Sequence, residues 1–190
     1  MTQRPSRGDG SRGEVYDMRH GFVVGKIGVL VGYAEFCGAK GIESGARVEL
    51  RRMIEQSPPK GNGPTPATPV IFGDPVWRVD IFSRSSGPPG NWSGAHHHIS
   101  FRGVQPGRRC FDASLTSSPL AWLERCLRDL ASVLTTVGAD DLVPQIQHKE
   151  WERALPGIVD AVSAYMQEGL EKISAITTGD ISSTGPRGSA

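Results

Sequence analysis

Four polar side chains have the types and spacing to do chemistry together: Arg78, Asp80, His96 and His98. Arg78 and Asp80 are two residues apart, as are His96 and His98, so each pair projects from one face of an extended strand. Two neutral imidazoles and a carboxylate form a ligand set that suits a divalent transition metal such as Zn, Fe(II) or Mn(II). Arg78 is then the candidate to orient an anionic group beside the ion.

The two segments that carry these residues read as paired strands. Residues 76–83 and 95–102 alternate polar and apolar side chains and are joined by turn-forming residues. If the strands pair antiparallel, their apolar faces meet one core, and the polar side chains share the opposite face with Cβ atoms about 5 Å apart. The apolar face is expected to contain Trp77, Val79, Ile81, Ile99 and Phe101, with His97 beside them as a core histidine.

The same residues allow two other interpretations. Asp, Arg and His side chains on a polar sheet face readily form a solvated surface cluster that contributes little to stability. An acid–base site without a metal is the third interpretation. His20 could add a nitrogen ligand, but nothing in the sequence places it near the other residues.

Composition limits the class of protein. The chain has 190 residues, of which 37% are apolar and 22% charged, enough for one domain of ordinary size. Its net charge of +1 gives no basic field, so we expect no nucleic-acid partner. No stretch approaches the roughly 20 consecutive apolar residues of a membrane span, so no membrane partner is expected.

The N-terminal segment lacks the apolar run of a signal peptide, which favours a cytoplasmic location. Cys37, Cys110 and Cys126 form no C-x-x-C pair, so we expect structural thiols.

The order of the predicted elements indicates an α+β fold. Apolar segments within 22–33 and 46–54 predict further strands, which gives a mainly antiparallel sheet in the N-terminal half. About three helices are expected in the C-terminal half, packed on one face of that sheet. Their predicted ranges are 119–137, which stops at Gly138, about 140–154, and 156–176, which starts at Pro156.

We expect a single domain over residues 14–176. The flanking segments 1–13 and 177–190 are polar and glycine-rich and are predicted to be disordered tails. The Pro/Gly-rich residues 56–69 are predicted to be a surface loop or linker. The apolar stripes of the first and third helices could pack in the core, or could instead form a homodimer.

Two resemblances involve the histidines. Gly90, five intervening residues and His96-x-His98 resemble the first part of the first cupin motif, which implies metal ligands at the histidines. The glutamate and the second motif of metal-binding cupins have no counterpart, so we do not carry over a cupin ligand set. The segments 74–80, 109–112 and 118–123, with the histidines, look like a pattern in uncharacterised actinobacterial hypothetical proteins. That resemblance implies one domain and no known activity.

From the sequence we therefore expect a soluble domain of unknown biochemical function that binds a protein or ligand without catalysis. The alternative is a small metal-dependent enzyme in which His96, His98 and Asp80 hold the ion and Arg78 orients the substrate.

Overall fold

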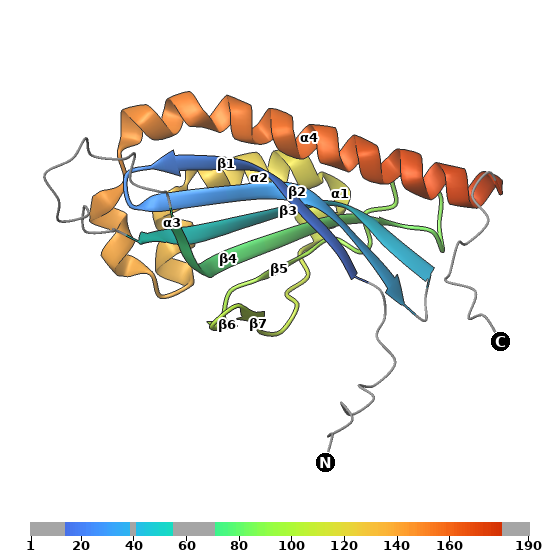
Figure 1. Cartoon of the computed structure of the whole chain (residues 1–190), viewed down its shortest axis with the longest axis horizontal. Helices are drawn as coiled ribbons and strands as arrows, with labels where there is room; N and C mark the ends of the chain where they lie inside the picture. Colours follow the sequence, from blue (N-terminus) through green and yellow to red (C-terminus); the bar gives the residue numbers. More distant parts are fainter. Residues whose placement is uncertain (1–13, 39–40, 55–70, 180–190) are drawn as a thin grey trace, which may run out of the picture.

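The computed structural model describes residues 14–38, 41–54 and 71–179. Within them, five strands form one antiparallel sheet in which each strand pairs with the next along the chain (Figure 1). These strands are β1 (Glu14–Val24), β2 (Ile27–Gly38), β3 (Gly41–Ile54), β4 (Ile71–Arg84) and β5 (His96–His98). The predicted antiparallel sheet in the N-terminal half is therefore confirmed.

The remaining elements follow the sheet in the chain. A short hairpin pairs β6 (Phe101–Arg102) with β7 (Gln105–Pro106). The helices are α1 (Ala113–Ser117), α2 (Pro119–Arg128), α3 (Leu130–Thr136), the 3-10 helix η1 (Asp140–Gln145) and α4 (His148–Thr178). Figure 1 shows the long α4 lying across the sheet, and it contacts each of the strands β1 to β4. The predicted α+β class, with helices in the C-terminal half, is confirmed.

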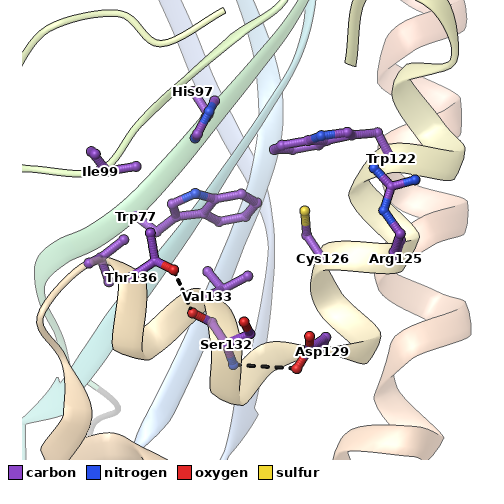
Figure 2. A pocket seen from close by; sticks show the side chains of 11 residues that line it. Trp77, His97, Ile99, Trp122, Arg125, Cys126, Asp129, Ser132, Val133 and Thr136 are labelled. Carbon is purple, nitrogen blue, oxygen red and sulfur yellow. Dashed lines mark hydrogen bonds between the residues drawn. The ribbon is translucent and has the colours of Figure 1, made fainter. Parts of the chain in front are cut away.

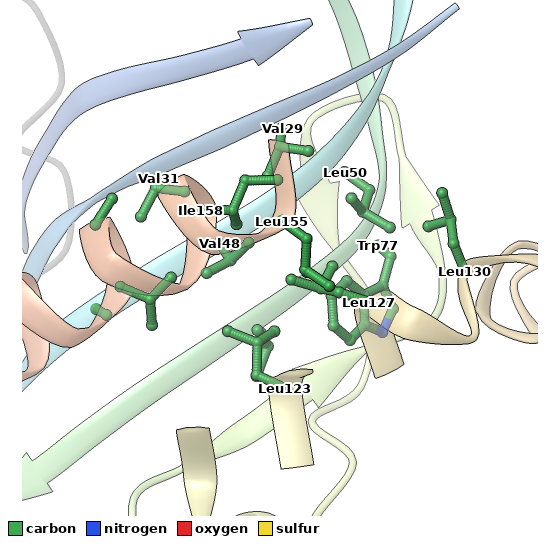
Figure 3. Packing of buried hydrophobic residues seen from close by; sticks show 14 of the residues in the cluster. Val29, Val31, Val48, Leu50, Trp77, Leu123, Leu127, Leu130, Leu155 and Ile158 are labelled. Carbon is green, nitrogen blue, oxygen red and sulfur yellow. The ribbon is translucent and has the colours of Figure 1, made fainter. Parts of the chain in front are cut away.

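The hydrophobic core lies between the helices and one face of the sheet (Figure 3). Alternate strand residues point into it because side chains on a strand alternate between two faces. Helices α2 and α4 supply apolar stripes spaced by three and four residues. These core residues are 0% exposed: Val29, Val31, Val48, Leu123, Leu127, Ile158 and Val162. The apolar stripes of these helices are thus buried in the core of the same chain. A homodimer would need a different surface.

The helix boundaries differ from the prediction at two places. The helix expected over 119–137 is α2 and α3, separated at Asp129, whose carboxylate accepts a hydrogen bond from the Ser132 N–H at 3.4 Å. The apolar spacing continues across this break, so periodicity does not reveal it. The expected helix over 140–154 is η1 followed by the first turns of α4. Pro156 opens no new helix but lies inside α4, on its exposed side, where water can bond the carbonyl that proline leaves unpaired.

The strand expected over 95–102 is shorter than predicted. β5 ends at His98, and Ser100 accepts a hydrogen bond from the Gly107 N–H at 2.8 Å. Beyond β5 the chain therefore folds back on itself, so that β6 pairs with β7 instead of continuing the pairing with β4. Ile99 is 36% exposed and Phe101 partly exposed, so the expectation that both join the core is wrong.

The domain boundaries are only partly covered by the structure. α4 continues to Thr178, slightly beyond the predicted end of the domain at 176. The predicted disordered segment 1–13, the proline-rich segment 56–69 and residues 180–190 lie outside the described residues.

Candidate metal centre

The backbone register places the four candidate residues side by side. β4 and β5 pair antiparallel, with Arg78 opposite His98 and Asp80 opposite His96. Trp77 alternates with these residues and points into the core, so the four polar side chains lie on the sheet face away from the helices. The structure thus brings together the residues that the sequence singled out.

This cluster is closed off from solvent. Asp80 and His96 are 1% exposed, His98 is 3% and Arg78 is 9% exposed. The ring of Phe111 packs 5.7 Å from the ring of His96. The interpretation as a solvated surface cluster is therefore wrong. Each buried charge here needs a partner, because an unpaired charge in the interior is strongly destabilising.

Three potential ligand atoms converge within the cluster. Oδ2 of Asp80 lies 3.3 Å from Nε2 of His96 and 3.7 Å from Nε2 of His98. All three residues offer ligand atoms within 4.8 Å of one another. Ligands held about 2.0–2.1 Å from a tetrahedral ion lie roughly 3.3–3.4 Å apart. The observed spacing is therefore close to that of a metal-ligand set.

Backbone carbonyl groups orient both imidazoles. Nδ1 of His96 lies 2.7 Å from the carbonyl oxygen of Gly94, and Nδ1 of His98 lies 2.9 Å from that of Gly107. A carbonyl oxygen only accepts hydrogen bonds, so each Nδ1 carries a proton and donates it. The other ring nitrogen, Nε2, then donates to Asp80 when the ring carries both protons, and offers a lone pair to a metal ion when the ring is neutral. Metal-binding histidines are oriented in the same way, by a hydrogen bond from the second ring nitrogen.

Two arginines flank the carboxylate of Asp80. Nε of Arg47, on β3, donates to Oδ1 at 2.6 Å, and Nε of Arg78 lies 3.2 Å from Oδ2. Nη2 of Arg78 also lies 3.2 Å from Nε2 of His98. The guanidinium of Arg78 thus contacts two of the three potential ligand atoms and supplies positive charge where a metal ion would.

The carboxylate of Asp80 is held in its charged form. Burial alone would raise the pKa of Asp80, but the charge of Arg47, hydrogen bonds from His96 and His98 and the charge of Arg78 hold that pKa well below its usual range. Asp80 is therefore ionised at neutral pH, which both an ion pair and a metal ligand require.

Sequence reasoning missed two members of the cluster, Arg47 and Glu49. They are 2% and 3% exposed and lie on β3, opposite Asp80 and Arg78 respectively. Their place on one strand face follows from the alternation of that segment. Their partners do not, because the sequence between the two segments contains no short hairpin-turn motif that would fix the register of β3 against β4.

Two other sequence candidates take no part in the cluster. His20, on β1, hydrogen-bonds through Nδ1 to Oη of Tyr165 on α4 at 2.7 Å, which places it on the helix-covered face. Gly90, the first residue of the cupin-like spacing, has φ +84° in the loop before β5, and its N–H donates to Oγ of Ser83 at 3.2 Å. Its role there is to form a turn.

Comparison with known proteins adds no functional assignment. No protein-family model matches the chain, no curated protein matches its sequence and no solved structure matches its fold. The resemblance to uncharacterised actinobacterial proteins therefore stays a prediction. Among the described residues, none of the helices is long and apolar enough to cross a membrane.

Proposed function

We propose that the protein is a non-catalytic binding domain that holds one divalent transition-metal ion through Asp80, His96 and His98. The proposal is supported by the convergence of one carboxylate oxygen and two Nε2 atoms, with both imidazoles oriented by backbone carbonyl groups. Two nitrogen ligands and one oxygen ligand suit Zn, Fe(II) or Mn(II). A tetrahedral ion would have one position left for water or a ligand.

The alternative is a small metal-dependent enzyme that uses the same three ligands and Arg78. A catalytic ion keeps an exchangeable position that substrate and water can reach. The three ligand side chains are between 1% and 3% exposed. That burial favours an ion that stabilises the domain over one that turns over substrate.

Arg78 controls how strongly a cation can bind. An ion between the three ligands would have the Arg78 guanidinium as a near neighbour, because that group lies 3.2 Å from two of the ligand atoms. Two like unit charges 4 Å apart repel by about 4 kcal/mol at an effective dielectric constant of 20. We therefore expect Arg78 to turn toward Glu49 when the ion binds, since Nη1 of Arg78 already lies 3.9 Å from Oε1 of Glu49.

The direct test is the metal content of the full chain purified without a histidine tag. We expect stoichiometric transition metal by mass spectrometry, and a melting temperature that rises with added Zn²⁺ or Mn²⁺ and falls with a chelator. His96→Ala and His98→Ala should each lose the ion. His148→Ala is the matched control because His148 is an exposed histidine at the start of α4, outside the cluster.

The variant Arg78→Met separates metal binding from a purely ionic cluster. If the three residues bind a metal, removal of the competing charge should strengthen Zn²⁺ binding by roughly tenfold or more. If the cluster is only an ion-pair network, neither the wild-type chain nor Arg78→Met will retain metal, and Zn²⁺ will not change either melting temperature. That result would overturn the proposal.

A further inference from the structure

A cavity lies on the other side of β5, between the sheet and helices α2 and α3 (Figure 2). Its volume is about 270 Å³. A cavity of about 150 Å³ is enough to hold one benzene ring. This one therefore has room for two fused rings. The residues of the candidate metal centre do not line it, because β5 turns His97 toward the cavity and His96 and His98 away from it.

The inner wall of the cavity is aromatic. The rings of Trp77 and Trp122 stack with centroids 6.1 Å apart and an interplanar angle of 22°, and the ring of His97 lies 5.3 Å from that of Trp122. Ile99 and Val133 add aliphatic surface. In Figure 2 the Trp77 indole is drawn between His97 and Val133, and the Trp122 indole projects toward it from α2. A flat aromatic molecule packs favourably against such a surface.

His97 supplies a polar group inside this apolar wall. Its Nδ1 is buried and has no hydrogen-bond partner among the described residues. Its backbone is fixed, because His97 and Cys110 exchange N–H to carbonyl hydrogen bonds of 2.9 and 2.8 Å. An imidazole nitrogen of this kind can accept a hydrogen bond from a ligand group in the cavity. A hydroxyl or N–H group on a ligand can pair with such a ring.

The charges around the cavity favour an uncharged ligand. Arg125 and Asp129 line it and carry opposite signs. Burial raises the pKa of the Cys126 thiol to about 11, so that side chain is a neutral lining group at pH 7 and not a nucleophile. Neither a cation nor an anion therefore finds a net complementary charge.

We propose that this cavity binds a small, uncharged aromatic molecule of about two fused rings, with its rings against Trp77 and Trp122 and one hydroxyl or N–H group on His97. The proposal does not depend on the metal centre, because the two sites share no side chain.

The probe for this proposal is 2-naphthol, titrated into the full chain by calorimetry and followed by ligand-observed NMR. We expect saturable binding with a negative heat-capacity change, as apolar surface is buried. 2-Methoxynaphthalene, which cannot donate a hydrogen bond, should bind about tenfold more weakly. His97→Phe should abolish this preference and leave the two compounds with similar affinities. A preference that survives in His97→Phe would contradict the assigned role of His97.

A cavity-filling variant tests the location. Val133→Trp should fill the cavity and abolish 2-naphthol binding. Thr135→Trp is the control, because Thr135 is exposed on the same helix and does not line the cavity. Circular dichroism melting checks that both variants fold. Absence of saturable binding to the wild-type chain, or undiminished binding to folded Val133→Trp, would overturn the proposal. If Val133→Trp does not fold, the loss of preference in His97→Phe still decides it.

Discussion

Asp80 is the residue that allows the neighbouring arginines to stay buried. Its two carboxylate oxygens contact Arg47 at 2.6 Å and Arg78 at 3.2 Å. Asp80→Asn keeps the shape of the side chain but removes its charge, which leaves the Arg47 and Arg78 guanidinium groups without this counter-charge. We expect it to lower the free energy of unfolding by about 3–5 kcal/mol, measured by urea denaturation in a chelating buffer so that metal loss does not contribute.

The matched control for Asp80→Asn is the exposed ion pair between Asp141 and Arg52. The side chain of Asp141 is 65% exposed and that of Arg52 is 40% exposed. Water compensates for the loss of such a pair, so Asp141→Asn should change the free energy of unfolding very little. Equal effects of the two substitutions would show that burial of the Asp80 pair has no energetic consequence.

α4 and β3 approach each other closely at a pair of glycines, Gly169 and Gly45. A Cβ atom on Gly169 of α4 would lie 2.5 Å from Cα and 2.7 Å from N of Gly45 on β3. Alanine is favoured over glycine inside a helix by about 1 kcal/mol. Here the backbone of β3 cannot move aside, so the steric clash outweighs the helix preference for alanine. We expect Gly169→Ala to destabilise the protein by about 1–3 kcal/mol in urea denaturation.

Gly157, in the same helix, provides the control for Gly169. A Cβ atom there would meet Cε1 of Phe22 at 3.3 Å, which is the end of a side chain that can turn away. Gly157→Ala should therefore stabilise the protein by up to about 1 kcal/mol. If both alanine variants shift stability in the same direction, the close approach of α4 to β3 is not what requires glycine at 169.

The elements of this fold differ in how far sequence could predict them. That Asp80 and His96 lie on one face was predictable, because each alternating segment has one apolar and one polar face. Their direct pairing was not, because a register shift of two residues keeps the same face. The break at Asp129 was not, since Leu127 and Leu130 keep the helical spacing on both sides of it. The pairing of Arg47 with Asp80 could not be predicted from the sequence either, because it depends on the register of two strands that are distant in the sequence.

The least predictable property of the whole molecule is that both faces of β4 are buried. Trp77 and Val79 face the helices, yet Asp80 and Phe82 on the opposite face are 1% and 0% exposed. Alternation of polar and apolar residues is typical of a strand with one solvated face. Here the polar face is closed, and its charged side chains form ion pairs with one another. The sequence could therefore identify four residues that share this face, but not that the face is closed to water.

The pH dependence of stability follows from three groups on different elements. Burial lowers the pKa of His97 on β5. It therefore contributes stability above the unfolded value of about 6.5, which is lost as the pH falls through the lower folded pKa. Asp80, whose pKa is also lowered, contributes stability that is lost below about pH 4. Burial raises the pKa of Cys126 on α2 to about 11, so its contribution is lost as the pH rises from about 8.5 toward that value.

We therefore expect a stability plateau between about pH 7 and 8.5, with a separate cause for the decline on each side. Urea midpoints measured across this range and beyond it test the assignment. His97→Phe should reduce the decline that begins below about pH 6.5 and leave the alkaline side unchanged, because phenylalanine fills the same site without a titratable group. Cys126→Ala should do the reverse. If both variants keep the wild-type pH profile on both sides, the titrating groups lie elsewhere, and the burial of His97 and Cys126 does not control the stability of the molecule.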